Sequence, residues 1–189
     1  MIVMGIDPGS EKHAWSVLDV RREEGIWRQR YVDHGLCDSV RDAVTLVRRW
    51  ADPEIIPASV GPGFDIDALF VESPVHFIPS GEGKGGAAFA QASKLLEMCK
   101  AIGRLLQAAD DAGVMVCQVP AQRWRSNLIE RGNAKDAEIA AVVTAEIAGW
   151  PKRSSNHARD AAGVALGGYR LWWVEQDEAR KAASGKAVA

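Results

Sequence analysis

Cysteine is scarce in this chain, and the few cysteines are not grouped. Cys37, Cys99 and Cys117 are odd in number and far apart in sequence. Their spacing matches neither a disulfide framework nor a Cys-based zinc motif. We therefore expect three free thiols.

An excess of positive charge is also missing, since 23 Lys and Arg stand against 25 Asp and Glu, a net charge of −2. The chain thus differs from a strongly basic nucleic-acid-binding domain, and contacts with phosphates must come from local groups of basic residues. No apolar run is long enough to span a bilayer, and the first residues do not resemble a secretory signal. We expect a cytoplasmic protein without a membrane partner.

The composition is that of a globular domain, with 47% hydrophobic and 25% charged residues in a chain of 189. This length fits one domain. We predict a domain over 1–173, followed at 174–189 by a polar, alanine-rich tail or an extension of the last helix.

Apolar and alternating runs predict five strands, at 1–6, 13–20, 26–33, 68–71 and 114–119. The first three follow one another without an intervening helix, which is typical of an antiparallel meander. Helical periodicity predicts helices at 39–50, 86–112, 134–147 and 157–173, with Ser39 as the N-cap of the first. The order favours an α/β fold in which a mixed five-stranded sheet is flanked by helices.

Four residues at the ends of predicted elements are candidates for metal chemistry. Asp7 and Glu72 end two apolar strands, while His157 and Asp160 share one face of the last helix. Carboxylates gathered in one crevice repel one another, and a divalent cation relieves that repulsion. Oxygen ligands favour Mg²⁺ or Mn²⁺, and a neutral imidazole fits Mn²⁺ somewhat better.

Each of these four residues also has an ordinary explanation, as a turn residue, a surface carboxylate or a helix-start residue. Their joint occurrence at corresponding element ends favours a shared site. Such a cluster fits in-line displacement at a phosphodiester, with two cations activating water and stabilising the leaving oxygen. His157 can be a metal ligand or a proton acceptor, and the sequence leaves both roles open. Three glycines of the last helix, Gly163, Gly167 and Gly168, predict close packing on the sheet that would hold Asp160 at a set depth.

Several motifs resemble those of the RuvC-type Holliday junction resolvases. Residues 5–10 (GIDPGS) are similar to the first-strand motif, 69–72 (LFVE) to the second acidic motif, and 156–162 (NHARDAA) to the last-helix motif. Residues 119–124 (VPAQRW) and the helix that carries Lys135 also fit, so that the resemblance covers most of residues 1–169. Many members have aspartate where this chain has His157, residues 51–67 form a longer segment than usual, and the loop after Glu72 is unusually rich in glycine.

The resemblance implies an RNase H-like fold and a structure-selective DNA endonuclease that cuts four-way junctions by paired nicks. It also implies two Mg²⁺ or Mn²⁺ ions per active site, bound by Asp7, Glu72, His157 and Asp160. A homodimer would place two active sites on two strands, with the helix at 86–112 as the candidate dimer surface. A DNA substrate extends the expected location to the nucleoid, or to the host cytoplasm if the owner is a virus.

Basic and aromatic residues near the motifs are candidates for DNA contacts. The segment 122–135 carries Arg123, Arg125, Arg131 and Lys135, and Lys152 and Arg153 precede the last helix. Closeness to the proposed site favours Lys135, Lys152 and Arg153. In the glycine-rich loop, Phe77 can stack on a base or wedge the junction open, and a local packing role fits it equally well. Lys84 lies in a stretch expected to face the substrate.

Three other interpretations remain open at this point. The Asp-Pro-Gly-Ser turn also resembles the phosphate-binding turn of sugar kinases and actin-like ATPases, but these need two such domains. An RNA-processing nuclease of the same superfamily, or another branched-DNA nuclease, would use a similar first motif. A non-catalytic DNA-binding protein on this fold is the third alternative.

Overall fold

The computed structural model describes residues 1–9, 12–52, 65–74 and 85–186. Its elements in chain order are β1 (Ile2–Pro8), β2 (His13–Glu23), β3 (Ile26–Cys37), α1 (Val40–Ala51), β4 (Ala68–Ser73), α2 (Gly85–Asp111), β5 (Met115–Pro120), α3 (Ala121–Ile129), α4 (Asp136–Glu146), β6 (Ile147–Ala148) and α5 (Asn156–Lys186). Ser39 caps α1 as predicted, its hydroxyl accepting from the backbone N–H of Asp42.

One mixed sheet organises the molecule, with strand order β5-β4-β1-β2-β3-β6. The meander β1-β2-β3 is antiparallel, whereas β4 pairs parallel to β1, and β5 to β4. This confirms the predicted mixed sheet but corrects its size, because β6 adds a sixth strand parallel to β3. That strand has two residues, which is too short to give a periodic pattern.

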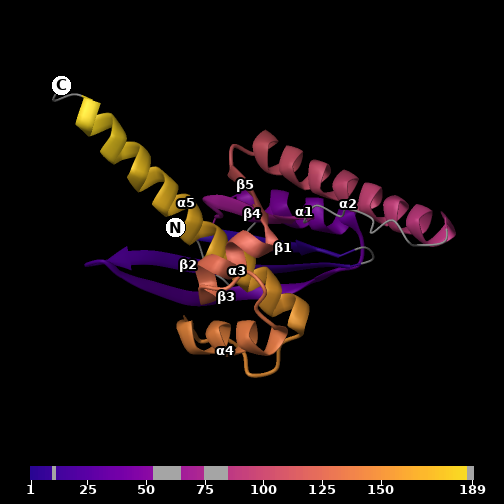
Figure 1. Ribbon diagram of the computed structural model, residues 1–189, viewed down its shortest axis with the longest axis horizontal. Helices are drawn as coiled ribbons and strands as arrows, with labels where there is room; N and C mark the ends of the chain where they lie inside the picture. Colours follow the sequence, from indigo (N-terminus) through magenta and orange to yellow (C-terminus); the bar gives the residue numbers. More distant parts are fainter. Residues whose placement is uncertain (10–11, 53–64, 75–84, 187–189) are drawn as a thin grey trace.

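Helices cover both faces of the sheet, with α1 and α2 on one side and α3, α4 and α5 on the other (Figure 1). Successive side chains of β1 point to opposite faces of the sheet and so belong to two different cores. Met4 and Ile6 pack with α1 and α2, whereas Val3 packs with α5. Gly5 and Asp7 therefore face α5. Among the described residues, no helix is long and apolar enough to cross a membrane.

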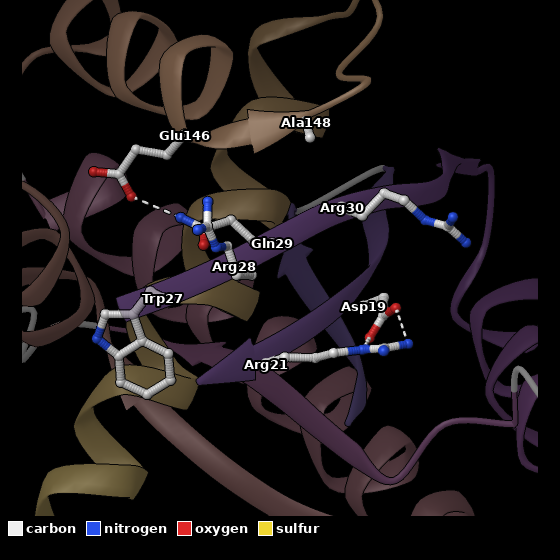
Figure 2. Close-up of a pocket in the computed structure, with 8 residues that line it drawn as sticks. All are labelled: Asp19, Arg21, Trp27, Arg28, Gln29, Arg30, Glu146 and Ala148. Atoms are coloured by element: carbon white, nitrogen blue, oxygen red, sulfur yellow. Dashed lines mark hydrogen bonds and ion pairs between the residues drawn. The ribbon is translucent and has the colours of Figure 1, made fainter. Parts of the chain in front are cut away.

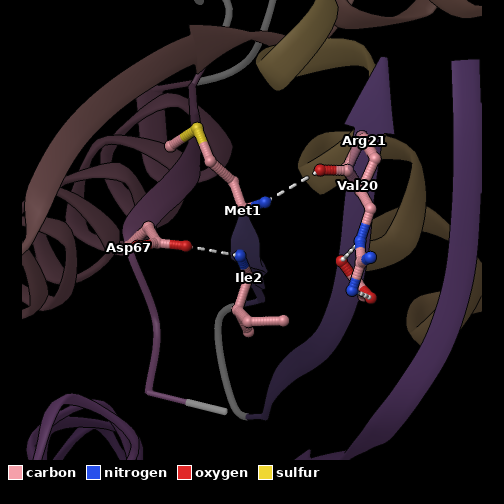
Figure 3. A network of polar contacts seen from close by, with 6 residues as sticks. Met1, Ile2, Val20, Arg21 and Asp67 are labelled. Carbon is pink, nitrogen blue, oxygen red and sulfur yellow. Dashed lines mark hydrogen bonds and ion pairs between the residues drawn. The ribbon is translucent and has the colours of Figure 1, made fainter. Parts of the chain in front are cut away.

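The start of β1 is held on both sides by polar contacts (Figure 3). The nitrogen of Met1 donates to the carbonyl oxygen of Val20 at 3.0 Å, and the backbone N–H of Ile2 donates to Oδ2 of Asp67 at 2.6 Å. These contacts tie β1 to β2 and to the residue before β4. They help to fix the register that brings the far ends of β1 and β4 together.

Helix α5 crosses the sheet at close range, and its C-terminal part projects beyond the other elements (Figure 1). A Cβ on Gly5 would lie 2.0 Å from the carbonyl oxygen of Ala161, so only glycine lets α5 pack this closely on β1. On α5 itself, Gly168 meets Phe70 of the sheet, as predicted. Gly163 and Gly167 instead meet Trp124 of α3, a contact that the sequence did not reveal.

Candidate metal centre

Asp7 and Glu72 reach the site from neighbouring parallel strands. Ile6 pairs with Val71, so the next residues, Asp7 and Glu72, lie side by side where the two strands end. Both side chains belong to the α5 face, because Gly5 and Phe70, two residues earlier, contact α5. The Asp7 side chain is 19% exposed.

The first turns of α5 bring His157 and Asp160 to Asp7. One ligand atom from each of these three residues can be chosen so that all lie within 4.8 Å of one another. Nδ1 of His157 is 3.3 Å from Oδ2 of Asp7, and the imidazole is 68% exposed. Glu72 is outside this closest group, although its charge interacts with Asp7 and Asp160.

Buried contacts fix the beginning of α5. The hydroxyl of Ser16 on β2 donates to the carbonyl oxygen of Ala158 at 2.9 Å. The hydroxyl of Ser155 accepts from the N–H of Ala158 at 3.1 Å. Because Ala158 lies between His157 and Asp160, these bonds orient both side chains toward β1.

Burial raises the pKa of all three carboxyl groups, and the charge of Asp7 raises the pKa of Glu72 and Asp160 further. Burial, followed by the charge of Asp7, raises the pKa of Glu72 to about 7. The same two causes raise the pKa of Asp160 to about 6. Burial also raises the pKa of Asp7, although hydrogen bonding and charge from His157 oppose the change. A bound cation would stabilise the ionised form of these three carboxyl groups and so relieve the cost of burying their charges together.

The donor set fits a hard divalent cation. Carboxylate oxygens from three strand and helix ends, with one imidazole nitrogen beside them, suit Mg²⁺ or Mn²⁺. Thiolate ligands are lacking here, because none of the three cysteines belongs to this group. The residues present are therefore chemically compatible with the metal chemistry expected from the sequence.

Arg125 on α3 is a basic side chain whose charge acts on all three carboxyl groups of this cluster. Its positive charge lowers the pKa of Asp7, Glu72 and Asp160 alike. The guanidinium stacks near the ring of Trp124, with 5.1 Å from Cζ to the ring centroid. Its Nε is buried and has no hydrogen-bond partner among the described residues. From the sequence, Arg125 was one of several basic residues in the segment 122–135, and nothing distinguished it as the one beside the carboxylates.

The other predicted DNA contacts lie in varied places. Arg123 pairs with Glu175 at 3.5 Å, on a part of α5 about 22 Å along the helix from Asp160. Lys135 is the N-cap residue of α4. Lys152 and Arg153 are exposed just before α5, whereas Phe77 and Lys84 lie outside the described residues.

A cavity of about 390 Å³ lies elsewhere, where β3 pairs with β2 and with the short edge strand β6 (Figure 2). Its lining includes Arg21, Trp27, Gln29 and Glu146, and Gln29 donates to Glu146 at 3.0 Å. It lies near the Ile2 end of β1, about 17 Å along the strand from Asp7. The acidic cluster, not this cavity, combines the chemical groups expected of an active site.

A meander followed by parallel strands, with acidic side chains at the ends of β1 and β4 and on the last helix, defines an RNase H-like fold. No family model matches the chain. Over 168 residues it is 28% identical to the crossover junction endodeoxyribonuclease RuvC of Sorangium cellulosum strain So ce56, a match that covers 88% of this chain and 83% of that protein.

Solved structures agree with this similarity. RuvC of Thermus thermophilus has a TM-score of 0.64 at 22% identity, covering 93% of this chain and 97% of that one. The yeast mitochondrial Holliday junction resolvase Ydc2 has a TM-score of 0.53 at 11% identity, covering 97% and 83%. The resemblance to RuvC-type resolvases and the RNase H-like fold are thereby confirmed.

Proposed function

We propose that this protein is a metal-dependent endodeoxyribonuclease that resolves four-way DNA junctions by paired nicks. One observation carries the proposal: Asp7, His157 and Asp160, from the two ends of the chain, have ligand atoms within 4.8 Å of one another, and Glu72 lies beside Asp7 on the neighbouring strand. The similarity to RuvC of Sorangium cellulosum over most of both chains supports the DNA substrate.

Asp7, Glu72 and Asp160 would hold the divalent cations, two per site, and His157 would be a further ligand or the acceptor of a proton from the attacking water. When bound, Mg²⁺ or Mn²⁺ supplies Lewis acidity to the phosphate and makes a bound water more acidic. The protein's own contribution is a fixed cradle, because Ser16 and Gly5 set the position of α5 against the strands.

Arg125 would stabilise the negative charge that develops on the phosphate. Its positive charge lowers the pKa of all three carboxyl groups, which supports a role in the same site. A fixed positive charge beside a reacting phosphate favours the transition state over the ground state. Lys135, Lys152 and Arg153 would bind the DNA backbone further from the cut.

A homodimer would present two such sites to the two strands of a junction. Helix α2 is the proposed contact surface, since it lies along one side of the molecule and exposes Leu96 to 55% (Figure 1). The proposed substrate places the protein's activity at the nucleoid, or in the cytoplasm of a host if the protein is viral.

The test is cleavage of a labelled four-way junction with Mg²⁺, Mn²⁺ or EDTA by the wild type, Asp7→Asn and Asp177→Asn. We expect symmetric paired nicks that require metal and Asp7, and normal cleavage by Asp177→Asn, a matched change far along α5. Junction binding by Asp7→Asn should persist, because phosphate contacts are spread over several basic residues.

Linear duplex, a fork and a structured RNA serve as competing substrates. Preferred cutting of RNA would transfer the assignment to an RNA-processing nuclease. No cleavage of any substrate with either metal, despite junction binding, would instead indicate a non-catalytic DNA-binding protein.

A further inference from the structure

Trp124 is a buried residue with an unusual hydrogen-bond partner. Its side chain on α3 is 0% exposed, and its Nε1–H donates to Oε2 of Glu72 at 2.8 Å. A buried tryptophan needs an acceptor for its N–H. Here the acceptor is a carboxylate of the candidate metal centre.

The indole is held in place by a recess in α5. A Cβ on Gly163 would lie 2.6 Å from Cζ3 of Trp124, and a Cβ on Gly167 would lie 2.5 Å from its carbonyl oxygen. Two glycines one turn apart thus let α3 sit directly against α5. Because Gly163 follows Asp160 by three residues, the helix that carries Asp160 also forms the wall behind the indole.

Glu72 depends on this contact for its orientation. Trp124 is the one hydrogen-bond donor to its carboxylate among the described residues. Glutamate has more rotatable bonds than aspartate, so a ligand of this type needs an outer partner to select one rotamer. With Oε2 engaged by the indole, the carboxylate of Glu72 is held at one end and Oε1 stays free of a hydrogen-bond donor among the described residues.

We propose that Trp124 is a positioning residue of the metal centre, which acts through its N–H on Glu72 and so increases affinity for the divalent cation. The inference rests on the proposed function. It assigns to α3 a part in metal binding that none of the motifs indicated.

The experiment measures Mn²⁺ binding to the DNA-free protein by electron paramagnetic resonance of free Mn²⁺, at pH 8. Trp124→Phe removes the N–H and keeps an aromatic ring. We expect its dissociation constant to rise by about ten- to a hundredfold, the usual effect of losing an outer hydrogen-bond partner of a metal ligand. Trp50→Phe, a buried change in the opposite core, should leave the constant within about twofold of wild type.

Since phenylalanine leaves a small void, benzothienylalanine at position 124 provides the second variant, with the size of tryptophan but no N–H. It should fold like the wild type in urea titration and still bind Mn²⁺ more weakly. Normal affinity in both position-124 variants would overturn the inference and leave the proposed function intact. Absence of Mn²⁺ binding in the wild type itself would overturn the proposed function and, with it, the inference.

Discussion

Without metal, the folded protein should lose stability as the pH rises, and Glu72 should be a principal cause. The folded pKa of this carboxyl group is about 7, raised from 4.5 first by burial and second by the charge of Asp7. A raised folded pKa contributes stability that is fully present below the unfolded value and is lost as the pH passes the folded value. The relevant window therefore runs from about pH 4.5 to pH 7.

The magnitude follows from the size of the shift. A rise from 4.5 to about 7, at about 1.4 kcal/mol per pKa unit, corresponds to about 3 kcal/mol of unfolding free energy. Glu72→Gln keeps the shape and an oxygen that accepts from Trp124, but cannot ionise. In EDTA, the variant should match the wild type at pH 4.5 and exceed its stability by about 3 kcal/mol at pH 8.

Urea unfolding at both pH values, with EDTA throughout, gives the comparison. Glu178→Gln on the exposed far part of α5 is the matched control and should follow the wild type. Saturating Mn²⁺ should stabilise the wild type at pH 8 and help Glu72→Gln much less. If wild type and Glu72→Gln show the same dependence of unfolding free energy on pH in EDTA, the pKa of Glu72 is not raised by burial. The argument that a cation relieves buried charge at this place would then lose its main support.

Three further changes probe the frame around the cluster. Gly5→Ala places a Cβ against the backbone of α5 and should lower the unfolding free energy by about 1–3 kcal/mol or more, with loss of junction cleavage; unchanged urea curves would show that α5 can shift freely. Ser16→Ala removes the buried bond to Ala158 and should lower the unfolding free energy by about 1–3 kcal/mol, while normal stability would assign Ser16 no anchoring role. Arg125→Met should raise the pKa of Glu72 further, as ¹³C carboxylate NMR can measure, and reduce cleavage by about a hundredfold; an unmoved titration would place the guanidinium away from the site.

Much of the fold could be predicted because its strands contain short apolar or roughly alternating runs. The β1 run is buried on both faces, so every residue up to Ile6 is apolar or glycine, and Asp7 stands out as its first acidic residue. The same contrast marks Glu72 near the end of β4, after four buried apolar residues. A carboxylate that ends a buried strand is visible in sequence without any knowledge of the partner strands.

Other parts gave no such signal. Strand β6 exists because two residues after α4 happen to pair with Gln29 and Arg30, a tertiary contact rather than a local preference. The strand predicted at 114–119 is confirmed as β5, but its last residue, Pro120, is also the N-cap residue of α3. A nine-residue helix in which five polar or charged residues surround one tryptophan has too few turns to show an apolar stripe.

The missed helix explains why the basic residues could not be ranked from sequence. On an α-helix, residues two apart point about 200° from one another, so Arg123 and Arg125 must leave α3 on nearly opposite sides. Arg123 accordingly pairs with Glu175, while the charge of Arg125 lowers the pKa of all three carboxyl groups. Closeness in sequence to a motif does not indicate which side of the helix a basic side chain occupies. The burial of Trp124 between them against Gly163 sets the rotation of the helix and thereby selects Arg125 as the cation of the site.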